Sequence, residues 1–575
     1  MQPTVRRPFH LRKGLLWIGI LAAVGWAAWQ ANLFNRELTN PGGWTLVARL
    51  INGLFHPDLS LDFLRLTLDS VLITLAYAVL GTFLSLVFGV AGGVLSSEVW
   101  WQGYGYYVKD QKTTAPARRT AQRAPWLAMR TLLAVPRSLH EIVWGLIFLN
   151  ILGLNPLTAI LAIAVPFGAI CAKVFSEILD EQPRQPFLAL LNAGASPLQA
   201  LLYGLFPQAL PNLVSYSFYR FECSIRSATV LGVIGAGGLG YQILLSLQSL
   251  RYEEFLPLLV ALVVLSGLTD LWSSKLRGAL GGATRIELQT GDSTRRSAQT
   301  SGGMQSPGFI RGSLFLIILL TIFSFVFLKI DLSILLSPRT TNLLNGILRD
   351  AFPPRLPEGG IPTLVRLAGQ TLAISILAMA AASLFAMLAA FLASKMAAFS
   401  GRSTGTPAST RVWRSIRVAA VRLVLLIARA VPTPIWALVI LFVVLPGILP
   451  GAIALGLHNW GITGRLMTET IDNMDDRPSI ALKALGASRV QTFFYGVFPE
   501  VFPGFISYTF YRWENCIRET IVVGIVGAGG LGRLLTEQLS NFDFAGITST
   551  IITLIFLTLL VDILSSEVRR TFRMG

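Results

Sequence analysis

Apolar runs long enough to cross a lipid bilayer recur along this chain, and no other feature constrains its fold as strongly. A membrane-spanning helix needs about 20 consecutive, mostly apolar residues. One of the runs, residues 71–95, opens with the letters VLITLAYAVLGTFLSLV. Hydrophobic residues make up 53% of the 575 residues and charged residues only 13%, whereas a soluble domain has about 25% charged residues. We therefore predict an all-α, polytopic membrane protein.

Twelve membrane spans are predicted from these runs. They cover residues 14–31, 68–96, 127–151, 155–179, 212–234, 253–275, 311–330, 364–394, 417–445, 448–472, 504–526 and 545–566. The third and ninth spans are expected to begin as amphipathic helices on the inner surface. Lys and Arg gather in the head, in the tail and in the gaps 99–126, 276–311 and 395–416. With twelve spans all five basic segments fall on one side, which is the cytoplasmic side. We therefore expect both termini in the cytoplasm.

The rest of the composition argues against several other classes of protein. The net charge of +17 is spread over the gaps between spans instead of one soluble basic face, so nucleic acid is not an expected partner. The three cysteines lie in or beside apolar runs and the four histidines lack metal-ligand spacing. We expect no disulfide framework, metal or cofactor. The apolar run from Leu15 follows a basic head, as in a signal peptide, but it is long and lacks a convincing cleavage site, so we expect a retained span.

The chain repeats itself. Residues 276–310 are rich in Gly, Ser and Thr, which is typical of a flexible linker, and they divide the chain into two halves of six spans. The letters SYSFYRFECSIR from Ser215 correspond to SYTFYRWENCIR from Ser507, 292 residues later, and 25 of 47 positions are identical between 194–240 and 486–532. Because both halves have the same orientation, we predict two parallel six-helix repeats about an axis along the membrane normal.

A cytoplasmic segment between the fourth and fifth spans of each half carries one spacing twice. The first copy reads LALLNAGASPLQALLYGLFPQALP from Leu188, and the second reads IALKALGASRVQTFFYGVFPEVFP from Ile480. Glycine permits a left-handed turn and the serine two residues later can cap the next helix. We predict two short helices, the second of which a proline ends before the next span. The residues concerned are Gly194, Ala195, Ser196, Pro207, Gly486, Ala487, Ser488 and Pro499.

This segment resembles the EAA coupling loop of ABC importer permeases, in which Glu-Ala-Ala is followed by three residues, a glycine and, after twelve more residues, a proline. The Gly–Pro spacing matches in both copies, but the glutamate positions hold Leu188 and Ile480. The phrase SYxFYRxExxIR with the later GAGGLG is similar to phosphonate-import permeases. The segments RSLHEIVWGLIF and RAVPTPIWALVIL match the R-x-x-P-E-x-V-W pattern of that family, except that His140 replaces the proline and Thr433 the glutamate.

The resemblance implies a fold, partners and a function. It implies two copies of a type I ABC importer permease fused in one chain, in the inner membrane of a bacterium. The implied partners are the lipid bilayer, two copies of an ABC ATPase on the cytoplasmic side, and a periplasmic or lipoprotein substrate-binding protein. The implied cargo is phosphonate or a related oxyanion such as phosphite or a phosphate ester. Import of another small solute and ion-coupled secondary transport are the alternatives.

The implied domain order has five parts. These are a first span with a periplasmic segment (1–66), a first ABC transmembrane type-1 permease domain (67–275), a cytoplasmic linker (276–310), a span with a periplasmic segment (311–363) and a second permease domain (364–567). No G-x-x-x-x-G-K-[ST] loop occurs in the sequence. ATP hydrolysis is therefore expected on a separate subunit, and the chain is not expected to be an enzyme.

Charged residues lie deep in the fifth span of each half. An acid and a base four residues apart share a helix face and can form an ion pair: Glu222 with Arg226, and Glu514 with Arg518. Charges near the bilayer midplane are costly and face a cavity or a partner, so these four residues are candidates for the substrate path or for helix–helix contacts. In the first case Arg226 and Arg518 would face each other across the path. Arg220 and Arg512 point away from these pairs and could reach back to the inner surface.

The six letters GAGGLG follow each charged phrase. They fit G-x-G-x-x-G, but no βαβ unit surrounds them, so a dinucleotide site is not expected. We expect the glycines to break a helix or to let two backbones approach closely. The positions are Gly235, Gly237, Gly240, Gly527, Gly529 and Gly532.

Overall fold

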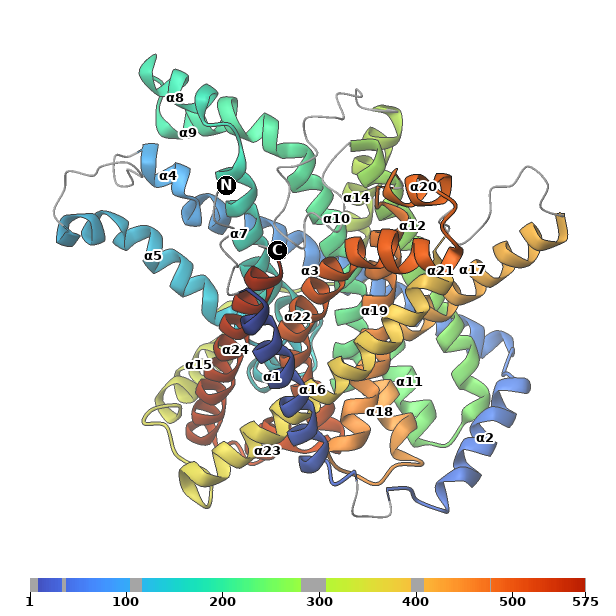
Figure 1. Cartoon of the computed structure of the whole chain (residues 1–575). Helices are drawn as coiled ribbons and strands as arrows, with labels where there is room; N and C mark the ends of the chain where they lie inside the picture. The colour runs from blue at the N-terminus through green and yellow to red at the C-terminus, as the bar shows by residue number, and fades with distance from the viewer. Residues whose placement is uncertain are drawn as a thin grey trace. The chain divides into compact units, whose positions relative to one another are not determined.

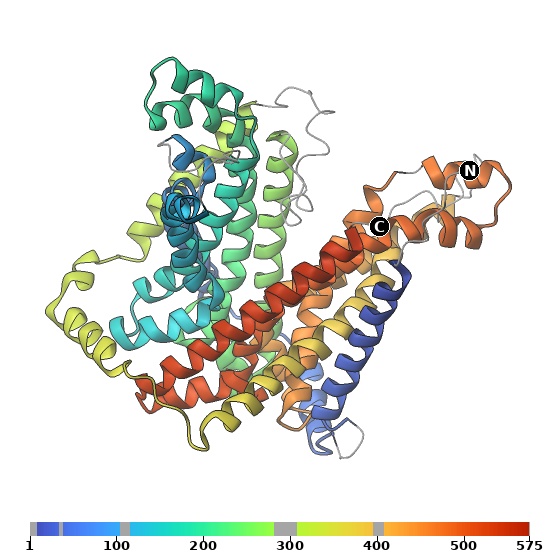
Figure 2. The ribbon, with the colours of Figure 1, turned by 60° about the vertical axis from the view of Figure 1, so that its left-hand side comes forward.

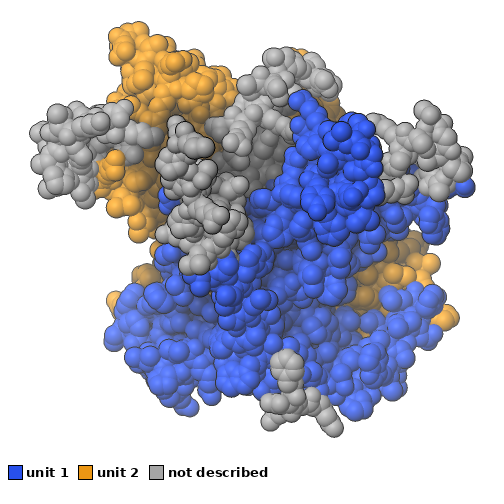
Figure 3. Space-filling model, in the orientation of Figure 1, with its two compact units in different colours: residues 1–55, 350–575 blue, residues 56–349 orange. Residues whose placement is uncertain are grey.

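The computed structural model describes residues 9–33, 38–103, 116–280, 307–394, 408–475 and 477–573. These ranges are helical apart from turns and an isolated antiparallel bridge between Thr39 and Val444, and this confirms the all-α prediction. The chain forms two compact units, which Figure 3 shows in two colours. We call residues 56–349 the continuous unit and residues 1–55 with 350–575 the split unit.

In its described residues the continuous unit is built from nine helices of eleven or more residues, with short helices and helical turns between them. Its elements are α3 (Leu61–Ser96), α4 (Glu98–Gly103), α5 (Pro116–Ser138), α6 (Glu141–Leu152), α7 (Pro156–Glu181), α8 (Gln185–Asn192), α9 (Pro197–Ala200), η1 (Leu201–Leu205), α10 (Phe206–Leu231), η2 (Gly232–Ala236), α11 (Gly238–Gln248), α12 (Tyr252–Leu280), α14 (Pro307–Phe327), η4 (Leu332–Leu336) and α15 (Pro338–Asp350). The short pair α8 and α9 projects beyond the long helices in Figures 1 and 2.

The split unit repeats this order after two helices from the start of the chain. Its elements are α1 (Phe9–Gln30), α2 (Gly43–Phe55), α16 (Gly360–Ala393), α17 (Ala408–Ala430), α18 (Thr433–Leu441), α19 (Ile448–Asp472), α20 (Arg477–Ala484), α21 (Arg489–Thr492), η5 (Phe493–Val497), α22 (Phe498–Val523), η6 (Gly524–Ala528), α23 (Gly530–Ser540) and α24 (Phe544–Arg573). Within this unit α20 and α21 lie at one end of α19 and α22, and α18 and α23 lie at the other end (Figure 1).

The predicted spans correspond to helices, although four of them are broken. Among the described residues six helices are long and apolar enough to cross a membrane, and four bent pairs raise the number to ten. The shorter apolar helix Gly14–Gln30 and the 25-residue α19 occupy the two remaining predicted positions. The bends are 84° between α5 and α6, 92° between α17 and α18, 55° before α11 and 67° before α23. The prediction of unbroken spans over 127–151 and 417–445 is therefore wrong, whereas the bends before α11 and α23 confirm that the GAGGLG glycines break a helix.

The bends between α5 and α6 and between α17 and α18 follow from capping. The ring nitrogen Nδ1 of His140 accepts the Ile142 N–H at 3.3 Å, so a new helix begins there. In the split unit Pro432 occupies the same cap position and Pro434 lies in the first turn, where a proline loses no helical hydrogen bond. The first half thus uses a histidine cap where the second half uses proline.

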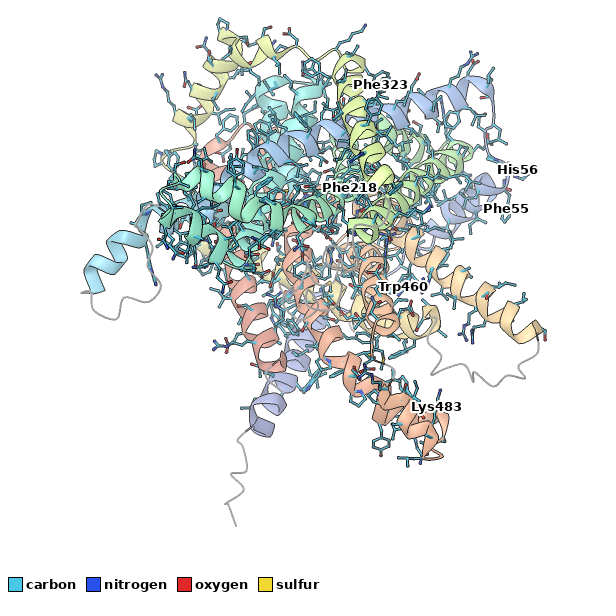
Figure 4. All side chains as sticks on the ribbon, turned by 90° about the horizontal axis from the view of Figure 1, so that it is seen from above. Phe55, His56, Phe218, Phe323, Trp460 and Lys483 are labelled. Atoms are coloured by element: carbon cyan, nitrogen blue, oxygen red, sulfur yellow. The ribbon has the colours of Figure 1, made fainter. Side chains whose placement is uncertain are left out.

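The first helix of each half packs in the unit that holds the other half. Helix α1 lies along α16 in the split unit, as Figure 2 shows, and Trp17 stacks on Phe502 with ring centroids 6.2 Å apart. Helix α14 lies along α3 in the continuous unit. There Ile310 packs on Phe218, which is labelled in Figure 4, and the Trp272 indole N–H donates to Ser313 at 3.1 Å. The units therefore cut across the two halves of the sequence.

One helix pair forms the centre of each unit: α3 with α7, and α16 with α19. Small residues let these backbones come close, as is usual between membrane helices. A Cβ added at Gly89 would lie 2.5 Å from Cys171 Cβ, and one added at Gly93 would lie 2.8 Å from Phe175 Cβ. This central pair carries the segments that follow at its end, α8 in one unit and α20 in the other.

Candidate functional site

The segment after α7 folds as two short helices joined by a tight turn, as predicted. Gly194 has φ +88°, and the Ala195 N–H bonds to the Leu190 carbonyl at 3.0 Å, which closes α8. Ser196 then caps α9: its hydroxyl accepts the Gln199 N–H at 3.3 Å, and Gln199 Oε1 accepts the Ser196 N–H at 2.9 Å. The sequence analysis missed the glutamine, although S-x-x-Q is the signature of this capping box.

The second copy has the same geometry. Gly486 has φ +82°, and the Ala487 N–H bonds to the Leu482 carbonyl at 3.0 Å. Ser488 and Gln491 exchange the same two hydrogen bonds at 3.3 Å and 2.8 Å. We call residues 185–205 and 477–497 the coupling loops.

The proline that follows each coupling loop does not end a helix, which corrects the prediction. Helix runs from α9 through the π turn η1 into α10, and Pro207 lies in the first turn of α10. Pro207 has no N–H for the carbonyl of Tyr203, and the Phe206 N–H bonds to the Leu201 carbonyl, five residues back. Pro499 occupies the same place in α22, after η5. The proline widens a continuous helix, so each coupling loop is joined directly to the charged helix that follows.

Apolar side chains are exposed on both coupling loops. Tyr203 and the corresponding Tyr495 are both 76% exposed. Ile480, at a position where the EAA loop has glutamate, is 61% exposed, and Leu188 is 38% exposed. We call the exposed set the coupling patch. It comprises Leu188, Leu198, Leu202 and Tyr203 in the continuous unit, and Ile480, Leu485, Val490, Phe494 and Tyr495 in the split unit. Figure 4 shows Lys483 on the loop that carries the second copy.

A carboxylate joins three helices beside each coupling loop. Near the end of α7, Asp180 accepts the Ser97 hydroxyl at 2.6 Å and pairs with Arg130 of α5 at 3.4 Å. Arg130 Nε also donates to the Ser96 carbonyl, at the end of α3. We call this group the carboxylate clamp. In the split unit it recurs with Asp472, which accepts Ser394 at 2.9 Å and Arg422 at 2.6 Å. Sequence reasoning missed the clamp, although both acids and both arginines keep the 292-residue spacing.

The predicted acid–base pairs are present in only one unit. Glu222 and Arg226 approach to 3.9 Å on α10, and Arg226 also donates to Cys223 Sγ at 3.3 Å. In the split unit Glu514 pairs instead with Arg569 of α24 at 2.6 Å, and Arg518 lies 3.9 Å from Asp562. The second pair therefore ties α22 to α24, which the spacing within α22 could not indicate.

Arg220 and Arg512 are buried in their units, so the prediction that they reach back to the inner surface is wrong. Arg512 donates to Asn459 and to Glu519, whose carboxylate also accepts Asn459. The guanidinium carbon of Arg220 lies 3.7 Å from the centroid of the Phe167 ring. Both side chains thus stay within the helix bundle.

The GAGGLG segments form a sharp junction before α11 and before α23. Gly235, Gly237, Gly527 and Gly529 have φ between +86° and +107°, which only glycine adopts without strain. A Cβ at Gly240 would lie 1.8 Å from the Thr229 carbonyl oxygen, and one at Gly532 would lie 2.6 Å from that of Ile521. The first N–H groups of the new helices are held by threonine hydroxyls. Leu239 donates to Thr74, and Leu531 donates to Thr371, each at 2.9 Å.

Comparison with known proteins gives matches over most of the chain. The family model "Binding-protein-dependent transport system inner membrane component" matches residues 120–277 and 401–573. The phosphate-import permease protein PhnE of Mycolicibacterium smegmatis is 27% identical over 499 residues, which is 86% of this chain and 84% of that protein. The phosphite transport system permease protein PtxC of Stutzerimonas stutzeri is 32% identical over 253 residues, which is 44% of this chain and 83% of PtxC.

A solved structure also aligns with part of the chain. It is a chain of the MetNI methionine ABC transporter in an inward-facing conformation, with 24% sequence identity and a TM-score of 0.32. The alignment covers 39% of this chain and 99% of that chain.

Proposed function

The chain belongs to the family of binding-protein-dependent transport system inner membrane components, and from this premise we propose that it forms the membrane path of an ATP-driven importer for phosphonate or a related phosphorus oxyanion. The observation that carries the proposal is that the coupling loop, the charged helix and the glycine junction occur twice in one chain with matching geometry. Relatives named as phosphate-import and phosphite transport permeases support the substrate class. ATP hydrolysis belongs to a separate subunit.

Uptake measurements test this function. Cells that express the chain with its ATPase and binding protein should accumulate phosphite, phosphate or methylphosphonate, and vanadate should stop the uptake. The matched control is the same strain with an ATPase variant that cannot hydrolyse ATP. Uptake that resists vanadate but collapses with the ion gradient would instead make the chain a secondary transporter.

Each coupling loop docks one ATPase subunit in this proposal. The loop resembles the coupling loop of importer permeases but has Leu188 or Ile480 in place of the glutamate, so the contact is made by the exposed apolar side chains of the coupling patch. Tyr203 and Tyr495 are its central residues, because they are large and both 76% exposed. Buried aromatic side chains commonly dominate the binding energy of an interface.

A cysteine crosslinking experiment checks the docking. Single cysteines at Ser196 and Ser488 should each crosslink to the ATPase, since both are exposed at the turn of a coupling loop. The controls are single cysteines at Ser249 and Ser540, exposed residues that follow or end α11 and α23, and these should not crosslink. Failure at both coupling loops would contradict the proposal, and success at one alone would mean that a single ATPase is docked.

The substrate passes the charged helices α10 and α22. Arg226 and Arg518 lie in those helices with side chains 15% and 17% exposed, and each is a candidate for attracting the anion in transit. Replacing both with glutamine should lower uptake while the ATPase still copurifies. Normal uptake by the double variant would make both arginines helix–helix contacts only.

The proposed assembly is one copy of this chain, two ATPase subunits and an external binding protein in the bacterial inner membrane. Both chain termini and the basic segments face the cytoplasm, in keeping with the distribution of Lys and Arg. The match of PtxC to 44% of this chain supports the fusion of two permease copies. Two copies of this chain per ATPase pair, measured on the purified complex, would overturn this stoichiometry.

A further inference from the structure

One arginine of the repeat is placed in two different chemical environments. Arg220 and Arg512 are equivalent by the 292-residue spacing, and both are buried, with 7% and 8% exposure. Their helices and neighbouring turns match in the two units. A difference in their surroundings therefore reflects the residues next to them.

Arg512 has a closed set of partners. Its Nη2 and Nε donate to Asn459 Oδ1 at 2.6 Å and 3.0 Å, and Nη2 also donates to Glu519 Oε1 at 2.9 Å. Asn459 Nδ2 donates to the other oxygen of Glu519 at 3.0 Å. The charge of this arginine is balanced, and its hydrogen bonds are made inside the split unit.

Arg220 lacks both of these partners. The positions of Asn459 and Glu519 hold Phe167 and Ser227 in the first half. The Phe167 ring covers one face of the guanidinium at 3.7 Å. Among the described residues Nε and Nη2 have no hydrogen-bond partner and no carboxylate lies within 4.0 Å of the guanidinium. The Phe167 ring covers only one face of the guanidinium. The Nε–H and Nη2–H groups point outward in the guanidinium plane, so they can bind a ligand that lies in that plane.

In the first half the carboxylate near this position belongs to a different helix. Ser227 donates to Glu141 Oε1 at 2.5 Å, and His140 lies 3.4 Å from the other oxygen. Glu141 begins α6, and its counterpart in the second half is Thr433. Each half thus has one acid among these equivalent positions, Glu141 in the first half and Glu519 in the second. In the first half the acid is bound to Ser227 and not to Arg220.

Two buried guanidinium nitrogens of Arg220, Nε and Nη2, have no hydrogen-bond partner among the described residues, which is costly, and this edge suits an acceptor that arrives only during transport. Two N–H groups on one edge match two oxygens of a tetrahedral phosphorus oxyanion. We propose that Arg220 contacts the anion in transit and that Arg512 does not, so only the first half supplies a guanidinium for binding. This proposal rests on the proposed function as an oxyanion importer, and it adds a site to the candidates Arg226 and Arg518.

The test gives Arg220 the partners of Arg512. The triple variant Glu141→Thr, Phe167→Asn and Ser227→Glu reproduces the second-half residues and leaves the net charge unchanged. Uptake of phosphite and methylphosphonate should fall about tenfold or more, equivalent to about 1.4 kcal/mol, with no fall in Tm. The mirrored variant Thr433→Glu, Asn459→Phe and Glu519→Ser frees Arg512 and should retain uptake. Normal uptake by the first triple variant would overturn the proposal.

Single substitutions keep the test decisive if a triple variant does not fold. Arg220→Gln should lower uptake with little effect on Tm, because it removes a guanidinium that has no carboxylate partner and whose Nε and Nη2 have no hydrogen-bond partner among the described residues. Arg512→Gln should lower Tm, because it removes the cation that pairs with Glu519 at 2.9 Å within the split unit. A fall in Tm for Arg220→Gln as large as that for Arg512→Gln would make Arg220 structural and overturn the proposal. Absence of uptake of every phosphorus oxyanion by the unaltered protein would instead overturn the proposed function itself.

Discussion

The carboxylate clamp shows how single residues hold a coupling loop in place. Asp180 receives a hydroxyl, a backbone N–H from Val99 and the Arg130 guanidinium, and it lies five residues before α8. The same acid, arginine and serine recur around Asp472. A force applied to the coupling loop therefore reaches the ends of three helices through a few charged hydrogen bonds.

Replacing the clamp carboxylate should weaken both the fold and its link to the ATPase. For Asp180→Asn we expect a loss of about 2 kcal/mol, since hydrogen bonds to charged groups contribute about 1.5–3 kcal/mol each and the amide keeps some of them. Tm of the solubilised protein and uptake per ATP hydrolysed should both fall. Glu177→Gln on the same helix is the control. Its ion pair with Lys173 is half-exposed, so its effect should be within about 0.5 kcal/mol. Equal effects of the two variants would contradict a role for the clamp.

Sequence reasoning located the charged residues but, apart from the Glu222–Arg226 pair, not their partners. The positions of Arg220 and Arg512 in a span were read directly from the letters, whereas the partners of Arg512 lie 53 and 7 residues away, on α19 and on the next turns of α22. Pairing across helices depends on which helix faces which, and hydropathy carries no such information. The 292-residue spacing makes Phe167 and Asn459 equivalent positions. Comparing these two residues indicates that Arg220 and Arg512 have different neighbours.

At the scale of the helices, the apolar runs predicted where the chain is helical but not where it bends. At the break after Ser138 the cap position holds His140 and not a proline, and the nearest proline, Pro136, lies inside α5. The prolines at Pro207 and Pro499 suggested helix ends, yet each lies in a helix that continues through a π turn. A proline in the sequence thus indicates a change in the backbone hydrogen bonds of a helix. Whether the helix ends there depends on the side chains that pack around it.

A further prediction concerns the bends before α11 and α23, where the GAGGLG segments lie. Gly240→Ala should destabilise the protein by about 3 kcal/mol or more, because its Cβ would meet the Thr229 carbonyl oxygen at 1.8 Å and overpacking against backbone is costly. Gly312→Ala, inside α14 with no atom within 4 Å of the new Cβ, is the matched control and should be neutral or stabilising by up to about 1 kcal/mol. Thermal unfolding of both variants in detergent gives their Tm values. Similar Tm values would refute the close contact between Gly240 and the Thr229 carbonyl oxygen.

At the scale of the whole molecule, neither half of the sequence contains a complete unit. Helix α1 packs along α16 and helix α14 along α3, so each unit takes a helix from the opposite half. Hydropathy could not predict this exchange, because it identifies spans and not their neighbours.

Cutting the chain tests the exchange. Two fragments that meet within residues 281–306 should copurify when they are expressed together and should retain uptake, because α1 and α14 hold them in place. Removing residues 307–337 from the second fragment should abolish copurification or lower its yield severalfold, whereas removing only 281–306 should not. Fragments that fold and purify separately would show that the exchanged helices contribute little.

The carboxylate lies at different positions in the two halves, Glu141 and Glu519, and this difference has an evolutionary consequence. In a homodimer of single permeases every substitution occurs on both sides at once, so an acid cannot leave one copy of Arg220 and stay with the other. Joining the two copies in one reading frame removes that constraint, and Glu141 with Ser227 can diverge from Thr433 with Glu519. The gene fusion thereby permits symmetry breaking: one copy can specialise for contact with the cargo while its sister specialises for rigidity.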